Sequence, residues 1–248
     1  MAAPTFTPLD PRTWLAQQPI RENAHLYLII SAASEADALQ ALRTSVPVHP
    51  LLPIWSETPY AAWQPVMPYV TKLDPGSAFL SWIAETDSLD WGWLAVSRCD
   101  QEEVLAHLRS LTQVKVPDGR EVFFRFWDGR FFHSILEGLG DAAGDMLPVF
   151  ERYLINGKSL DIGPTKVPAV KDWPWWEMPK HLLDALSEQN PSARVENLMQ
   201  WLEEEHLDLF TAWPESNLKL KVSRCVRHAT NQEKVHEILL NELAREQC

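Results

Sequence analysis

The sequence predicts an α/β fold: a mixed β-sheet with flanking helices, followed by a β-hairpin and a mostly helical C-terminal lobe. Short apolar runs of strand length alternate with helical patterns through the first half of the chain, which is typical of a sheet covered by helices. Asn156-Gly157 then marks a hairpin, and the apolar spacing toward the C-terminus is helical. Gly138–Gly144 is polar and glycine-rich, so we expect two domains, residues 1–140 and residues 141–248.

Strands and helices carry different local signals. The run His25–Ile30 is almost entirely apolar, which indicates a buried strand. Helices begin where a side chain can cap the N-terminus, as at Asp10, Ser34 and Asp100. The expected strands are His25–Ile30, Tyr69–Leu73 and Trp91–Ser97, and the expected early helices span Pro11–Gln18, 35–43, 78–85 and 101–111. The expected late helices span Pro179–Gln189, Ser192–Glu205, 206–227 with an interruption at Pro214, and Asn231–Glu246.

Residues 114–132 form a distinctive strand–turn–strand–helix unit. Val114–Val116 and Glu121–Trp127 flank a turn in which Asp118 and Gly119 supply the backbone conformation of a tight hairpin. We place this hairpin at the end of the sheet. Aromatic side chains occur at both odd and even positions of the second strand, so a helix or a partner must cover each of its faces.

Two interpretations remain open for the polar residues that follow this strand. In the structural interpretation, Asp128 caps the helix Arg130–Leu139 while Arg125 and Arg130 form ion pairs with its carboxylate. In the functional interpretation, the two arginines donate hydrogen bonds to a carboxylate of a partner. We favour the structural interpretation because capping and pairing account for every residue.

Composition limits the class of partner. The apolar fraction is 46% and the charged fraction 23%, which is ordinary for a globular protein. The net charge of −12 argues against general nucleic-acid binding, because a phosphate surface needs a basic field. No apolar run is long enough for membrane insertion, no signal peptide is recognisable, and the three cysteines suit a reducing compartment. We therefore expect a cytoplasmic protein.

No catalytic or metal-binding motif stands out. The sequence has no nucleophile elbow, no Walker A loop and no histidine pair with metal-ligand spacing. Cys99 precedes a helix start, where a thiolate can be stabilised, but an ordinary cysteine at a strand end is the favoured interpretation. We expect no enzyme activity, no cofactor and no metal.

Tryptophan points instead to binding. The chain has 12 tryptophans, and its 19 prolines outnumber its 9 glycines, which favours stiff loops that carry aromatic side chains. The candidates for contact with a partner are Trp55, Trp63, Trp173, Trp175 and Trp176. The alternative for the last three is a loop packed between the two lobes, because both arrangements bury aromatic area.

Residues His25 to Leu139 resemble the adaptor, or effector-chaperone, family of the bacterial type VI secretion system. The resemblance is most specific from Leu108 to Phe132, in the runs P-D-G-R-E and R-F-W-D-G-R. Gly129 departs from the family, which more often has a small apolar residue or proline there. The residues that carry this signature are Asp118, Gly119, Arg125, Phe126, Asp128 and Arg130.

The resemblance implies a cytoplasmic adaptor that binds a cognate secreted effector protein and helps load it onto the spike tip protein of the secretion machine. The five tryptophans then become candidate effector-binding residues. Two alternatives stay open: an immunity-type protein that neutralises a toxin, and an enzyme whose site is assembled from residues distant in sequence.

Overall fold

The computed structural model describes residues 8–45, 49–164, 167, 169, 171–189, 191–228 and 235–246. The chain divides into two compact units, Met1–Pro179 and Lys180–Cys248. This boundary differs from the expected one at residue 140. The reason is that the hairpin after Gly140 pairs with the main sheet, so it belongs to the first unit.

The main sheet of the first unit has six strands in the order β2-β3-β1-β4-β7-β8. The α/β fold is confirmed, but every neighbouring pair is antiparallel, so the sheet is not mixed. Along the chain, helix α3 connects β3 to β4, and these two strands run parallel to each other, as alternation of strand and helix predicts. In the sheet, however, β1 lies between them and pairs antiparallel with both. The strands are β1 (His25–Ser31), β2 (Leu52–Pro53), β3 (Pro68–Leu73), β4 (Gly92–Ser97), β7 (Arg152–Ile155) and β8 (Lys158–Asp161).

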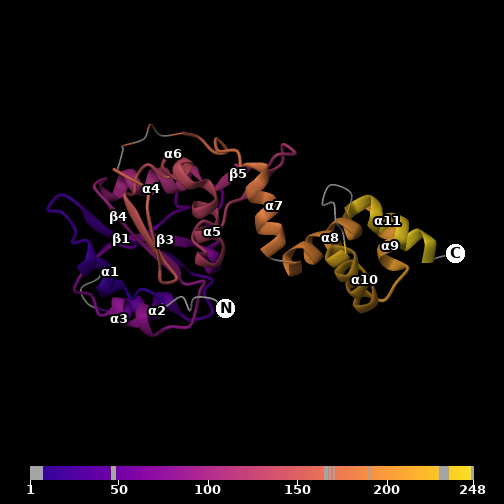
Figure 1. Ribbon diagram of the computed structural model, residues 1–248, viewed down its shortest axis with the longest axis horizontal. Helices are drawn as coiled ribbons and strands as arrows, with labels where there is room; N and C mark the ends of the chain where they lie inside the picture. Colours follow the sequence, from indigo (N-terminus) through magenta and orange to yellow (C-terminus); the bar gives the residue numbers. More distant parts are fainter. Residues whose placement is uncertain are drawn as a thin grey trace, which may run out of the picture. The chain divides into compact units, whose positions relative to one another are not determined.

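Helices cover both faces of this sheet (Figure 1). Leu26, Leu28 and Ile30 of β1 share a core with the helices α1 (Pro11–Gln17), α2 (Ala38–Thr44) and α3 (Phe79–Glu85). On the other face Trp93 stacks on Phe132 at 4.9 Å. This second layer contains α4 (Gln101–Ser110), α5 (Gly129–Leu139) and α6 (Ala143–Met146). Burial on both faces explains why β1 and β4 are apolar at nearly every position.

Helix starts follow the predicted caps with one exception. The Asp10 carboxylate accepts from the backbone N–H groups of Arg12 and Thr13 at 3.0 Å each, and Asp100 forms a capping box with Glu103. The predicted cap at Ser34 is wrong. Its hydroxyl donates to Asp90 at 2.8 Å, and the helix begins only at Ala38, after three more residues.

The hairpin of residues 113–123 is separate from the main sheet. β5 (Gln113–Lys115) and β6 (Glu121–Phe123) form their own two-stranded sheet, so the expected position at the end of the main sheet is wrong. β6 also ends before Trp127. The chain turns there, because the N–H of Phe126 donates to the carbonyl of Phe124 at 2.9 Å.

The second unit is helical, as predicted. Leu202, Leu218, Val222 and Leu239 lie in its core and are buried. The third predicted helix is interrupted before Pro214, as expected. Its helices are α7 (Lys180–Gln189), α8 (Pro191–Glu205), α9 (Leu207–Thr211), α10 (Glu215–His228) and α11 (Val235–Glu246). Among the described residues of both units, no helix combines the length and the apolar character needed to cross a membrane.

Candidate partner-binding surface

Two groups of aromatic side chains cover the two faces of the β5–β6 hairpin. Phe123 and Phe124 are consecutive, so their side chains point to opposite faces. Phe123 contacts what we call the Trp63 cluster, whose members are Trp55, Tyr60, Trp63, Phe123 and Trp127. Phe124 contacts what we call the Trp176 cluster, whose members are Phe124, Phe126, Phe132 and Trp176.

The Trp63 cluster extends from a buried tryptophan to an exposed one. Trp55 is only 2% exposed, and its ring lies 5.1 Å from Trp127 and 5.9 Å from Phe123. Above it, Tyr60 packs edge-on against Phe123 at 4.7 Å. Trp63 is 47% exposed although its ring lies 5.4 Å from Phe123. The cluster therefore leaves the Trp63 ring half exposed to solvent, and the other aromatic rings support it from below.

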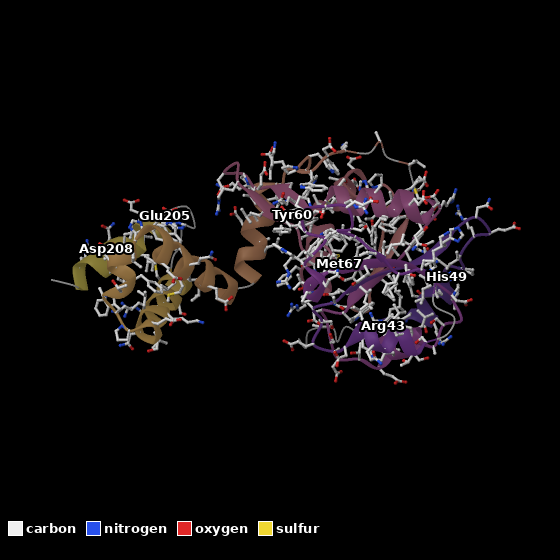
Figure 2. The ribbon with its side chains drawn as sticks, turned by 180° about the vertical axis from the view of Figure 1, so that it is seen from behind. Arg43, His49, Tyr60, Met67, Glu205 and Asp208 are labelled. Atoms are coloured by element: carbon white, nitrogen blue, oxygen red, sulfur yellow. The ribbon has the colours of Figure 1, made fainter. Side chains whose placement is uncertain are left out.

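Residues 54–67 form the loop that carries three members of this cluster, and hydrogen bonds within the loop order it. Backbone N–H groups donate to carbonyls three residues earlier along it, as from Thr58 to Trp55 and from Trp63 to Tyr60. The Thr58 hydroxyl also donates to the Trp55 carbonyl at 2.8 Å. Tyr60 and Met67, labelled in Figure 2, mark the middle and the end of the loop. Its conformation is thus set before any partner binds.

Arg109 of α4 fixes the start of the same loop. Its Nε donates to the carbonyl of Ile54 at 2.9 Å, and its Nη2 donates to the Ser56 hydroxyl at 2.8 Å. Its Nη1 forms an ion pair with Glu57 at 3.0 Å. A single guanidinium therefore links three positions of the loop to a helix of the core.

The Trp176 cluster is closed by the chain itself. The Lys115 N–H donates to the Trp176 carbonyl at 2.9 Å, and the Met178 N–H donates to the Lys115 carbonyl at 2.8 Å. Residues 176–178 thus run beside β5, and Glu177 forms an isolated parallel β-bridge with Lys115. The Trp176 ring lies 5.4 Å from Phe124, which is buried. This side of the hairpin is covered from within the first unit.

Trp173 and Trp175 belong to the same covering segment. The Trp175 indole N–H donates to the Ser110 hydroxyl at 3.0 Å, and the Nζ of Lys171 lies 3.9 Å from the centre of its ring. Trp173 is partly buried, like Trp175 and Trp176. Trp175 therefore packs against α4, and Trp176 packs against the hairpin side.

Asp128 joins the hairpin to α5 through two ion pairs that share its buried carboxylate. Its carboxylate is almost inaccessible and accepts from Arg125 Nη2 at 3.0 Å and Arg130 Nη2 at 2.7 Å. It also accepts from the Arg130 backbone N–H at 3.1 Å, which caps the helix. The hydrogen bond with Asp128 raises the pKa of Arg130. This arrangement is the one that the structural interpretation predicts.

The other signature residues have structural contacts as well. The Asp118 carboxylate accepts from the Arg120 N–H at 3.0 Å, and Gly119 has a φ of 85°, which favours glycine. The Phe126 carbonyl accepts from the Trp93 indole at 2.7 Å, which ties the hairpin to β4. At Gly129, a Cβ would lie 2.9 Å from the carbonyl oxygen of Gly92, so close packing requires glycine there.

Cys99 and the possible metal ligands give no site of their own. Burial raises the pKa of the Cys99 thiol to about 11, so the thiol stays protonated at neutral pH. Within the described ranges, no three His, Cys, Asp or Glu side chains gather where they could hold a metal ion.

Sequence reasoning found part of the Trp63 cluster. It named Trp55 and Trp63 but missed Tyr60 as a contact residue and Arg109 as the residue that holds the loop. The proline-rich setting of Tyr60 could have identified it. No local signal identifies Arg109, because its partners lie more than 50 residues earlier in the chain.

Comparison with known proteins gives one finding. Neither the curated proteins nor the solved structures include a match to the chain. Residues 26–143, which carry β1, β3, β4, the β5–β6 hairpin and the Trp63 cluster, match the model of a protein family described as a domain of unknown function, DUF4123.

Proposed function

We propose that this protein is a cytoplasmic adaptor of the bacterial type VI secretion system. In this role it binds one cognate effector protein and helps load that effector onto the spike tip protein. The match to DUF4123 supports the role, because it covers nearly the same residues as the resemblance to the adaptor family. The adaptor acts by binding, and the effector supplies any toxic chemistry.

The observation that carries the proposal is the exposed, pre-ordered Trp63 cluster within the matched residues. A large ring that is 47% exposed offers apolar area that a partner can bury. Val66, in the same loop, is 40% exposed and extends this apolar area. Because Arg109 and the backbone turns already fix the loop, binding costs little additional conformational entropy.

The surface suits an apolar segment of a partner with polar flanks. Trp63 and Val66 supply the apolar contact, and the exposed residues Glu57 and Gln64 lie on the same loop. Tryptophan at the centre of an interface contributes about 2 kcal/mol or more. The bound effector segment would therefore insert an apolar side chain against Trp63, with hydrogen bonds at the rim.

Co-purification tests this function. The protein is expressed with the effector encoded beside its gene, and the complex is isolated and quantified. We expect Trp63→Ala to weaken effector binding by about 30-fold, which corresponds to about 2 kcal/mol. The matched control is Leu89→Ala, which removes another exposed apolar side chain of the first unit, 53% exposed, outside the loop.

Two outcomes would contradict the proposal. One is absence of any complex between the wild-type protein and its neighbouring effector. The other is equal binding by the Trp63 and Leu89 variants, which would remove the Trp63 cluster from the interface. A toxicity assay in recipient cells separates adaptor from immunity protein: an adaptor is required for effector delivery, whereas an immunity protein protects the recipient.

A further inference from the structure

A second feature of the first unit, Arg152 of β7, stands apart from the Trp63 cluster. Its side chain is 5% exposed, and the guanidinium stacks on the Trp14 ring at 4.6 Å. Nη1 donates to the side-chain carbonyl of Gln18 at 3.2 Å, and Nη2 donates to the Gln18 backbone carbonyl. Both acceptors are uncharged. These contacts tie α1 to the sheet but supply no negative charge.

Arg152 forms no direct ion pair with any residue that the structure describes. Among the described residues, no carboxylate lies within 4.0 Å of its guanidinium, and no acceptor other than Gln18 is hydrogen-bonded to it. The undescribed residues of the first unit include no Asp or Glu. The nearest candidates are already engaged: Glu151 pairs with Arg98 at 2.7 Å, and Asp161 accepts from the Gln18 amide at 3.3 Å.

A buried charge without a directly paired counter-ion is costly, and arginine cannot avoid the cost by losing its proton. Asp161 and Glu151 attract Arg152 from a greater distance, which offsets part of this cost. Burial lowers the pKa of Arg152, yet a guanidinium stays charged at neutral pH. Arginine has five N–H donors in a planar fork, of which Gln18 uses two. The remaining donors have the geometry that binds two oxygens of a carboxylate or phosphate.

Arg152 also lines a cavity. The cavity has a volume of about 520 Å³, within the range of small-molecule sites. Arginines outnumber carboxylates in its wall by three to two, although the whole chain has a net charge of −12. Apolar groups complete the wall. The lining includes Arg21, Arg98, Arg152, Ile20, Val96 and Pro164.

We propose that this cavity binds the oxyanion of a small acidic ligand, a carboxylate or a phosphate, with Arg152 as its main contact. The guanidinium donates to two ligand oxygens, and the bound anion adds a directly hydrogen-bonded counter-charge to the more distant charges of Asp161 and Glu151. Ile20, Val96 and Pro164 contact the ligand's apolar part. The site is separate from the Trp63 cluster, so the absence of anion binding would leave the proposed adaptor function unaffected.

Nuclear magnetic resonance on the full chain tests the site. The indole N–H signal of Trp14 is the reporter, because its ring stacks on Arg152, and it is assigned by its loss in Trp14→Phe. The protein is titrated with sodium phosphate and, separately, with sodium acetate, each against sodium chloride at equal ionic strength. We expect a saturable shift with one or both anions that chloride does not cause. Acetate alone identifies a carboxylate site, and phosphate alone identifies a phosphate site.

Variants assign the effect to Arg152. Arg152→Met should weaken anion binding by at least about tenfold, because charge-assisted hydrogen bonds are lost. Arg152→Lys keeps a positive charge but loses the fork, and it should also bind about tenfold less tightly. The charge-matched control is Arg12→Gln, on exposed α1 surface outside the cavity, which should change affinity less than about twofold.

The lysine variant also covers the case in which Arg152→Met does not fold, since it keeps the charge beside Trp14. Two results would overturn the proposal. The first is a Trp14 signal that responds to neither anion more than to chloride. The second is equal anion affinity in the wild type and in Arg152→Lys.

Discussion

The two faces of the β5–β6 hairpin are built from similar aromatic residues but end differently. On one face the Trp63 cluster rises from buried Trp55 to Trp63, which is 47% exposed. On the other face Phe124 and Phe132 are buried, and residues 176–178 close the surface through a β-bridge to β5. Aromatic composition therefore does not distinguish a binding surface from a core. What distinguishes them is whether the chain returns to cover the rings.

The first way to test this comparison is to truncate the two consecutive phenylalanines. We expect Phe124→Ala to lower the free energy of unfolding by about 3–5 kcal/mol, because it opens a cavity among buried rings. Phe123→Ala should cost only about 1–2 kcal/mol, because its ring is partly exposed. Urea unfolding followed by near-ultraviolet circular dichroism measures both. Equal losses would mean that the two faces are equally packed.

The next largest effect is expected at Asp128, which joins the hairpin to α5. Asp128→Ala removes the α5 cap and the ion pairs with Arg125 and Arg130, and we expect a loss of about 2 kcal/mol. Asp128→Asn keeps an oxygen that can cap the helix and should lose less than half as much. The same unfolding measurement compares them. If Asp128→Asn loses more than half as much stability as Asp128→Ala, then charge, rather than capping, stabilises the junction.

A smaller effect is expected where the covering segment meets α4. Trp175→Phe keeps an aromatic ring but removes the hydrogen bond to Ser110, so we expect a loss of about 1 kcal/mol in the free energy of unfolding. Ser110→Ala removes the same bond from the other partner. If neither change lowers stability, the Trp175 contact does not hold the segment in place, and its ring becomes available to a partner.

His107, also on α4, makes the stability of the first unit sensitive to acid. Burial lowers the pKa of His107 below its ordinary value of 6.5, and the hydrogen bond to the Met146 carbonyl partly offsets this. The unfolded chain therefore takes up a proton first as the pH falls below about 6.5, and stability declines. Above that pH the contribution is fully present. We expect His107→Gln to flatten the decline measured by thermal unfolding at several pH values, and an unchanged slope would contradict this.

Much of the fold follows from local sequence signals, and the errors have physical causes. Caps at Asp10, Asp100 and Asp128 and the Asn156-Gly157 turn are local, so they were predictable. The strand order was not, because nothing in β3 or β4 shows that β1 lies between them. The domain boundary failed for the same reason: β7 is distant in sequence from the strand that it joins.

The candidate surface shows the same division. Aromatic alternation in β6 indicated that both faces needed a cover, and the structure identifies covering segments 55–63 and 173–178. Exposure of Trp63 could not be predicted, since Trp55 and Trp63 lie in similar proline-rich surroundings but differ in how far the chain folds over them. Arg152 was missed because its burial depends on α1, more than 130 residues earlier.

The smallest effect on stability is expected at the residue with the largest proposed role in binding. Trp63→Ala removes a half-exposed ring from the top of its cluster, so we expect the free energy of unfolding to change by about 1 kcal/mol or less. Trp55→Ala, in the same cluster but buried, should cost about 3–5 kcal/mol. Urea unfolding of both variants measures the contrast. A Trp63 variant that loses as much stability as the Trp55 variant would make Trp63 a core residue, and the comparison between the two faces of the hairpin would then no longer indicate where a partner binds.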